Sequence, residues 1–196
     1  MQKGFKRRIF TPRILASDIW FLLKNIRKFA VYRRNPTLDR AFLEKIMSVV
    51  TAVNGCVYCS WFHAREASAA GLDQAEIDDL FQLQFDTKAD EFELPALIYA
   101  QHFAETGRKP NPEETAAFKG YYGAKTAGEI MLFIRMILFG NLLGNTYDAF
   151  LSRLKGVPAF GSNVIFEFFF FLFSFPVMFP ASIVMKKDNR NKAKAG

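Results

Sequence analysis

The chain has 196 residues, of which 51% are hydrophobic, and it carries a formal net charge of +7. This length predicts one domain with a sizeable core. The charge is unevenly distributed, because residues 1–40 carry +9, residues 186–196 carry +4 and the remainder carries −6. Two basic ends on an acidic body argue against a nucleic-acid-binding surface and favour contact with an anionic membrane surface.

Residues 1–36 are interpreted as a basic amphipathic N-terminal extension. Thr11-Pro12 supplies an N-cap and a proline at the first helical position. A helix is expected over about 13–33, and Asn35-Pro36 ends it. Its apolar positions alternate with Lys and Arg, and Trp20 adds aromatic surface. Such a helix lies either in a membrane interface or on the protein's own core, and both interpretations stay open.

Residues 37–157 are interpreted as a helical domain. Gly, Pro and Asn-Gly signals divide this part of the chain into periodic segments. The capping box formed by Asp73 and Glu76 marks one helix start. Helices are expected over about 37–53, 56–70, 74–85, 91–105, 112–121 and 126–155. The sequence therefore predicts an all-α fold.

Both cysteines and one of the two histidines fall within eight residues, at Cys56, Cys59 and His63. Successive residues of a helix turn by about 100°, so these three side chains share one helix face. Cys59 and His63 are four residues apart, which brings their side chains within reach of each other. The pattern predicts a redox-active dithiol whose proton an imidazole accepts.

Two features favour a thiolate in this stretch: the start of a helix and the nearby imidazole of His63. Asn54-Gly55 is a turn signal, so the cysteines are expected in the first turn of a helix, where the positive end of the dipole favours an anion. The position of His63 favours Cys59 as the attacking sulfur and Cys56 as the resolving one, whereas the helix start favours Cys56. We give the imidazole more weight, because it is the specific feature of this motif.

Glu44 is the carboxylate that we assign to this group. On one straight helix it lies roughly 18 Å from Cys56, too far to act. If the chain folds back at Asn54-Gly55 as an antiparallel helix pair, Glu44 comes level with His63. It then fixes the tautomer of the imidazole, as the third member of a catalytic triad does. The alternative is a solvated carboxylate, because Glu44 lies opposite the apolar stripe of Phe42, Ile46, Val49 and Val53.

Other interpretations of the motif stay open. The cysteines can be inert core residues. The motif offers three zinc ligands, although no fourth Cys or second nearby His completes a structural site. A non-catalytic membrane-associated or assembly protein on the same scaffold predicts thiols of ordinary reactivity. Two cysteines without a signal peptide favour a reducing compartment, so we expect a cytoplasmic protein.

Two further groups of polar residues are given structural roles. His102 lies far from the motif in the sequence, and a histidine in such a position is more often structural than functional. Asn145, Tyr147 and Asp148 interrupt an apolar helix. We expect their polar atoms to be satisfied at a surface, and a pocket or an oligomer contact is the alternative.

The spacing of Glu44, eleven residues, and then Cys56-x-x-Cys59-x-x-x-His63 resembles the motif of the alkylhydroperoxidase D-like proteins. These proteins belong to the carboxymuconolactone decarboxylase superfamily. Residues 64–72 and 76–80 resemble the family's next turn and helix. The resemblance extends roughly over residues 38–155.

The resemblance implies an all-helical homo-oligomer, with a trimer or hexamer favoured. It implies that the Cys pair reduces an organic hydroperoxide, with Cys59 as the peroxidatic residue and Glu44 and His63 as a proton relay. The true decarboxylase branch lacks the Cys pair, so the resemblance favours that activity less, and a carboxymuconolactone decarboxylase-type enzyme is kept as the alternative. The sequence has no flavin, haem or nicotinamide motif, and we expect no cofactor. Electrons are then expected from a thiol donor, a dihydrolipoyl or thioredoxin-like protein.

Residues 158–196 are interpreted as a Phe-rich apolar segment followed by a basic tail. From Phe168 to Met185 there are 18 residues without a charge, which is the threshold length for crossing a bilayer. Pro176 and Pro180 are expected to kink the segment. The basic tail is placed on the cytoplasmic side. We therefore expect residues 164–185 to associate with the cytoplasmic membrane face without crossing. A cover over a lipophilic substrate site or a subunit interface is the competing interpretation.

Overall fold

The computed structural model describes residues 5–34, 37–85 and 89–195, with side chains described to residue 191 except for those of residues 33 and 34. Helices account for 78% of the structure. The expected all-α fold is confirmed. The described residues form seven helices: α1 (Pro12–Arg34), α2 (Arg40–Asn54), α3 (Val57–Ala69), α4 (Gln74–Gln82), α5 (Leu94–Glu105), α6 (Pro112–Leu154) and α7 (Val164–Ala195).

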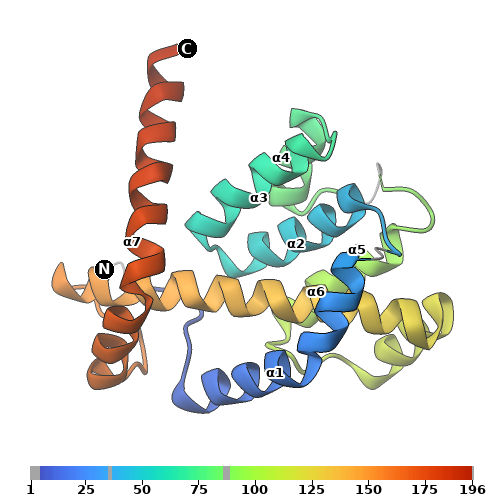
Figure 1. Ribbon diagram of the computed structural model, residues 1–196, viewed down its shortest axis with the longest axis horizontal. Helices are drawn as coiled ribbons and strands as arrows, with labels where there is room; N and C mark the ends of the chain where they lie inside the picture. Colours follow the sequence, from blue (N-terminus) through green and yellow to red (C-terminus); the bar gives the residue numbers. More distant parts are fainter. Residues whose placement is uncertain (1–4, 35–36, 86–88, 196) are drawn as a thin grey trace.

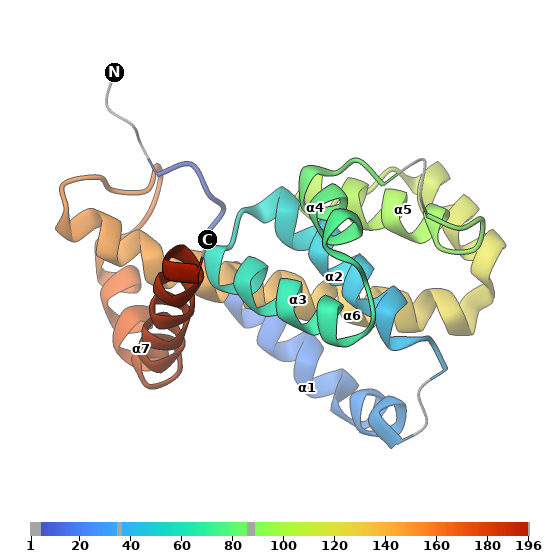
Figure 2. The same ribbon diagram turned by 90° about the horizontal axis from the view of Figure 1, so that it is seen from above.

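Helix α6 is the axis of the molecule (Figure 1). Helices α2, α3 and α4 lie on one side of it, and α1 lies on the other. Helix α7 crosses the C-terminal end of α6, and the view from above in Figure 2 shows α7 at the same end of the molecule. The core lies where α2 meets α5 and α6, and it includes the fully buried side chains of Ile46, Val49, Leu97, Ile130 and Ile134. The helix that precedes the Cys pair is therefore anchored at the centre of the fold.

Several helix ends differ from those expected. Helix α4 ends at Gln82 rather than near residue 85, because Leu83 adopts a left-handed conformation with φ 59°. By contrast, the break expected between residues 121 and 126 is present, because α6 consists of two helical stretches joined by a kink at Gly123, with φ 72° and ψ 163°. Helix α7 includes both Pro176 and Pro180 and extends to Ala195.

Helix α1 packs on α6 while one of its faces remains uncovered. The buried carboxylate of Asp18 accepts hydrogen bonds from both terminal nitrogens of Arg108, at 2.5 and 2.6 Å. It accepts a third from a terminal nitrogen of Arg135 at 3.2 Å. These ion pairs tie α1 to α6 and to the loop before it. Large apolar side chains are nevertheless exposed along α1, namely Ile19, Trp20, Leu23, Ile26 and Val31.

Among the described residues, α6 and α7 are long and apolar enough to cross a membrane, judged by length and composition. They differ in burial, since 56% of the apolar window of α6 is buried inside the molecule and only 22% of that of α7. Helix α6 is therefore explained as the core helix of this fold. The apolar surface of α7 has no such explanation among the residues that the structure describes.

Candidate active site

The tight reversal between α2 and α3 builds the site. Asn54 ends α2, and Gly55 follows with φ 65° and ψ 32°, a left-handed conformation that glycine adopts without strain. Its N–H donates to the carbonyl oxygen of Thr51, which closes the helix end. The reversal places α3 against α2, as the antiparallel pair expected from the sequence requires.

Cys56 and Cys59 form the first turn of α3. Cys56 is the N-cap, and its Sγ accepts a hydrogen bond from the backbone N–H of Cys59 at 3.3 Å. The two residues are joined as a disulfide with their Cα atoms 5.3 Å apart, within the usual range for such a bond. Cys56 is fully buried, whereas Cys59 is partly exposed. The backbone thus holds two sulfurs in bonding position at the positive end of a helix.

Glu44 and His63 meet across the helix pair. Oε2 of Glu44 lies 2.7 Å from Nδ1 of His63, and the two residues are only 6% and 7% exposed. The ring of Phe62 packs edge-on against the imidazole, with centroids 5.1 Å apart. With the carboxylate ionised, Nδ1–H is the donor, so the proton-accepting nitrogen of the neutral ring is Nε2. Glu44 is therefore a buried partner of the imidazole rather than a solvated carboxylate.

A second polar group joins α3 to α6 and the N-terminal strap, residues 5–11. The hydroxyl of Tyr58 donates to Oδ1 of Asp148 at 2.7 Å, and Arg7 donates to Oδ2 of the same carboxylate at 2.9 Å. Burial and, next, the hydrogen bond to Asp148 raise the pKa of the Tyr58 phenol well above its ordinary value. The phenol therefore stays a neutral donor in the working pH range.

Buried amides hold the turn before the Cys pair. Asn145 donates to the carbonyl oxygen of Asn54 at 2.9 Å, and Thr51 donates to Oδ1 of Asn141 at 3.1 Å. The polar residues that interrupt α6 thus bind α2 and α3 inside the molecule. The expectation that these polar atoms are satisfied at a surface is wrong for Asn145, which is fully buried and contacts the reversal that carries the cysteines. Asp148 is partly exposed and binds Tyr58 and Arg7.

Gly144 lets α6 approach the dithiol. A Cβ atom at this position would lie 2.7 Å from Sγ of Cys56 and 3.2 Å from Cδ2 of Tyr58. The same atom would lie 3.8 Å from Cε of Met178, so α7 also reaches this part of the site. Farther along α7, Asp188 accepts from Nε1 of Trp61 at 2.9 Å and from Arg65 at 3.2 Å. Helix α7 therefore covers one flank of α3.

Sequence reasoning missed Arg7, Tyr58 and Gly144. Two signals were available: a lone carboxylate on an apolar helix needs a donor, and a glycine inside such a helix indicates close approach. Neither signal identifies its partner, because Arg7 and Asp148 are 141 residues apart in the chain.

The described residues contain no group of three His, Cys, Asp or Glu side chains that could hold a metal ion. Glu44 occupies Nδ1 of His63, and the two sulfurs are bonded to each other. His102 lies elsewhere, where its Nε2 atom accepts from the N–H of Asn111 at 3.0 Å and lies 2.9 Å from Glu114. These contacts fit the structural role expected for His102.

The model of the carboxymuconolactone decarboxylase family matches residues 22–101, which include Glu44, the Cys pair and His63. No curated protein and no solved structure matches the chain. The matched segment carries the helix pair and the reversal that build the site. This match supports membership of the carboxymuconolactone decarboxylase superfamily, which includes the alkylhydroperoxidase D-like proteins, on the strength of residues 22–101.

Proposed function

We propose that this protein is a thiol-dependent reductase of organic hydroperoxides, in which Cys59 is the peroxidatic residue and Cys56 resolves. The observation that carries the proposal is the buried contact of 2.7 Å between Glu44 and His63, beside two cysteines in bonding position. A positioned carboxylate, an imidazole and a thiol form the usual means of activating a nucleophile.

The first half-reaction oxidises the dithiol. His63 accepts the proton of Cys59, and the thiolate attacks the terminal oxygen of R–O–O–H. The O–O bond breaks, and the leaving alkoxide takes a proton from the imidazolium, which gives R–OH and a sulfenic acid. The Cys56 sulfur then displaces water from the sulfenic acid and forms the disulfide. A thiol donor of the dihydrolipoyl or thioredoxin-like class returns two electrons by exchange through a mixed disulfide.

The assignment of the two sulfurs rests on exposure and packing. Cys56 is fully buried, serves as the N-cap and lies against Gly144, so a peroxide cannot approach it directly. Cys59 is partly exposed and lies one helical turn before His63. A carboxymuconolactone decarboxylase-type reaction and a non-catalytic scaffold are the alternatives. Neither accounts for a buried carboxylate–imidazole pair beside the dithiol.

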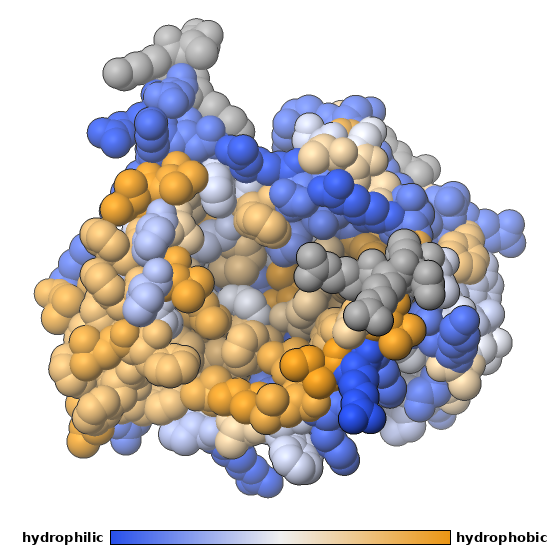
Figure 3. Space-filling view, viewed as in Figure 1, coloured by the Kyte–Doolittle hydropathy of each residue, from blue (hydrophilic) through white to orange (hydrophobic). Residues whose placement is uncertain are grey.

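We also propose that the protein binds the cytoplasmic face of a membrane as a peripheral homo-oligomer. Apolar side chains are exposed along α7, among them Phe169 at 63% and Phe173 at 87%. In the space-filling view of Figure 3, apolar surface covers the lower left, where the first half of α7 lies, and continues towards α1. A patch of this extent is typical of a membrane or subunit contact, and basic residues flank it on α1. A lipophilic hydroperoxide fits this setting.

The proposal is tested by peroxide turnover. The purified protein, with dithiothreitol as the electron donor, is expected to consume cumene hydroperoxide faster than hydrogen peroxide. Cys59→Ser is expected to abolish turnover, while Cys56→Ser is expected to accumulate a sulfenic acid that dimedone traps. Turnover that survives in Cys59→Ser would remove the mechanism.

A further inference from the structure

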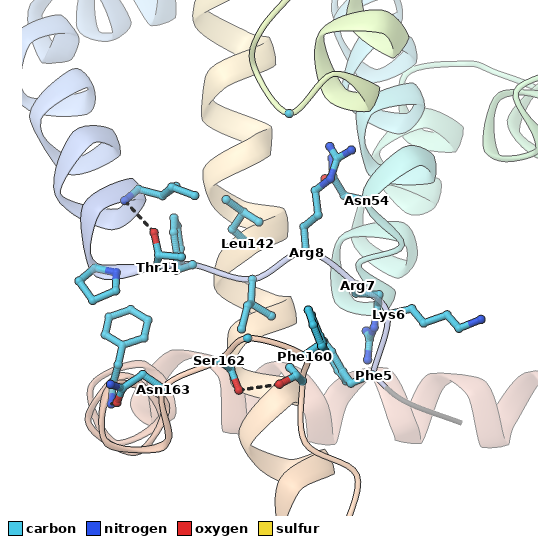
Figure 4. A pocket seen from close by; sticks show the side chains of 18 of the residues that line it. Phe5, Lys6, Arg7, Arg8, Thr11, Asn54, Leu142, Phe160, Ser162 and Asn163 are labelled. Carbon is cyan, nitrogen blue, oxygen red and sulfur yellow. Dashed lines mark hydrogen bonds between the residues drawn. The ribbon is translucent and has the colours of Figure 1, made fainter. Parts of the chain in front are cut away.

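A large cavity lies beside the N-terminal strap and has no role in the proposed chemistry. Its volume is about 1060 Å³, at the upper end of the roughly 300–1,000 Å³ range typical of small-molecule sites. The strap crosses α6 there, with Asn54 on one side and Phe160, Ser162 and Asn163 on the other (Figure 4). Five separate parts of the chain thus line it: the strap with the start of α1, the end of α2, the α5–α6 loop, α6, and the segment that leads into α7.

The wall of the cavity is apolar. Phe10 is 1% exposed and packs against the rings of Phe139 and Phe170, with centroids 5.4 and 5.5 Å away. Leu142 and Phe166 join this small cluster, which is separate from the main core. Phe10 and Leu142 are almost fully buried and back the wall, while partly exposed apolar side chains such as that of Phe166 supply the surface that a long hydrocarbon would contact.

All the charged side chains that line the cavity are positive. Five cations line the cavity, and no Asp or Glu stands among its described lining residues. Arg7 pairs with Asp148 and Arg108 pairs with Asp18, so two of the five charges are neutralised nearby.

The other three cations are not neutralised. Arg8 donates to the backbone carbonyl oxygens of Ala104 and Glu105, which carry no net charge. Lys6 and Lys109 form no ion pair within the described part of the chain. The positive charge that remains complements an anion.

A buried acceptor on the wall also lacks a partner. Asn54 is 3% exposed and donates through Nδ2 to the carbonyl oxygen of Val50 at 2.8 Å, but its Oδ1 atom has no hydrogen bond in the structure. Buried polar atoms nearly always have a partner. Asn54 lines the cavity where α2 ends, two residues before Cys56, but its Oδ1 atom is itself buried and, as an acceptor, does not bind a carboxylate. The cations of the lining are therefore the groups that select an anion.

We propose that this cavity binds a long-chain fatty acid, with the hydrocarbon along the wall and the carboxylate among the uncompensated cations. The site goes beyond the peroxide chemistry and does not depend on it, because none of its side chains belongs to the Cys59, Cys56, His63 and Glu44 group. Binding is therefore expected to be the same in Cys59→Ser, so a failure of this proposal and a failure of the redox proposal are distinguishable.

The experiment is photolabelling of the full-length protein in a non-ionic detergent with a diazirine analogue of palmitate. Peptide mapping is expected to place the label in residues 5–14 and 158–166. Label confined to residues 168–184 would show partitioning onto the exposed face of α7 and would overturn the proposal.

Competition and charge reversal test the head group. Palmitate is expected to compete at least about tenfold better than octanoate, because each buried methylene adds to affinity, and also better than uncharged hexadecanol. Lys6→Glu with Lys109→Glu is expected to lower labelling about tenfold, while the exposed Lys119→Glu outside the cavity leaves it unchanged. Equal labelling in these variants would overturn the role of charge. Competition by phosphatidylglycerol vesicles but not by palmitate would overturn the assignment to a free acid.

Discussion

Oε2 of Glu44 and Nδ1 of His63 are 2.7 Å apart, although the two residues are separated by 19 positions and stand on different helices. Their contact depends on the reversal at Gly55, which folds α3 back along α2. Both side chains are almost fully buried. A buried carboxylate must keep a partner, so this pair fixes both the orientation of the imidazole and the relation of the two helices.

Glu44→Gln tests the relay. The amide keeps the size of the side chain but removes the charge that stabilises the imidazolium, so kcat for hydroperoxide reduction is expected to fall about 10- to 100-fold with little change in KM. The matched control is Glu66→Gln, which removes a more exposed partner of Arg40 at 2.7 Å. Steady-state kinetics with cumene hydroperoxide measures both variants. Similar losses in the two would contradict a specific role for Glu44.

His63→Ala tests the activation of Cys59. In the reduced protein with Cys56→Ser, iodoacetamide is expected to alkylate Cys59 at pH 7 about tenfold more slowly when the imidazole is absent, since a thiolate is the reactive form. Mass spectrometry of quenched samples gives the rate. His102→Ala is the control, because His102 contacts the N–H of Asn111 far from the cysteines. An unchanged rate in His63→Ala would argue for the scaffold alternative.

Gly144→Ala tests the close approach of α6 to the dithiol. The added Cβ would lie 2.7 Å from Sγ of Cys56, so a loss of about 1–3 kcal/mol of unfolding free energy is expected. Gly140→Ala, one turn earlier in the same helix, meets nothing within 4 Å and is expected to stabilise by about 0.5–1 kcal/mol. Urea unfolding of the two variants measures the difference. Equal effects would mean that Cys56 is less tightly enclosed than the structure shows.

Tyr58→Phe tests the buried phenol through the pH dependence of stability. Because the pKa of Tyr58 is raised in the folded protein, the folded state keeps this proton at a pH where the unfolded state loses it. The stability contributed by the phenol is complete below about pH 10 and falls as the pH rises further. The slope is at most about 1.4 kcal/mol per pH unit, and smaller because the group is partly exposed.

Urea midpoints at pH 9 and pH 11 give this slope. This slope is expected to be shallower in Tyr58→Phe than in the native protein. Equal slopes in the native protein and Tyr58→Phe would contradict the prediction.

Charges on α7 test membrane association. Phe169→Asp with Phe173→Asp is expected to lower flotation with anionic vesicles at least about tenfold, because each buried aromatic side chain contributes roughly 1.5–3 kcal/mol. Ile98→Asp, at a residue of α5 that is 51% exposed, is the control. If flotation persists while light scattering shows smaller particles, this face is a subunit interface instead.

Local patterns determined much of this protein. The Pro, Gly and Asn-Gly signals separated the helices, and the spacing of Cys56, Cys59 and His63 put three reactive groups on one helix face. The pairing of Glu44 with His63 was predicted from one turn signal, Asn54-Gly55, which reverses the chain between two helices. These features follow from helical geometry and from turn chemistry, which act over a few residues and are therefore readable in a sequence.

The tertiary structure decided the rest. Arg7 lies in the basic N-terminal strap and Asp148 near the end of α6, and only the folded chain brings them together beside Tyr58. The space for Cys56 against Gly144 and the cavity beside the strap likewise arise where distant segments pack. Such contacts depend on the shapes and charges of surfaces that are far apart in the chain. No local period or spacing encodes them, because their physical cause is the packing of the whole fold.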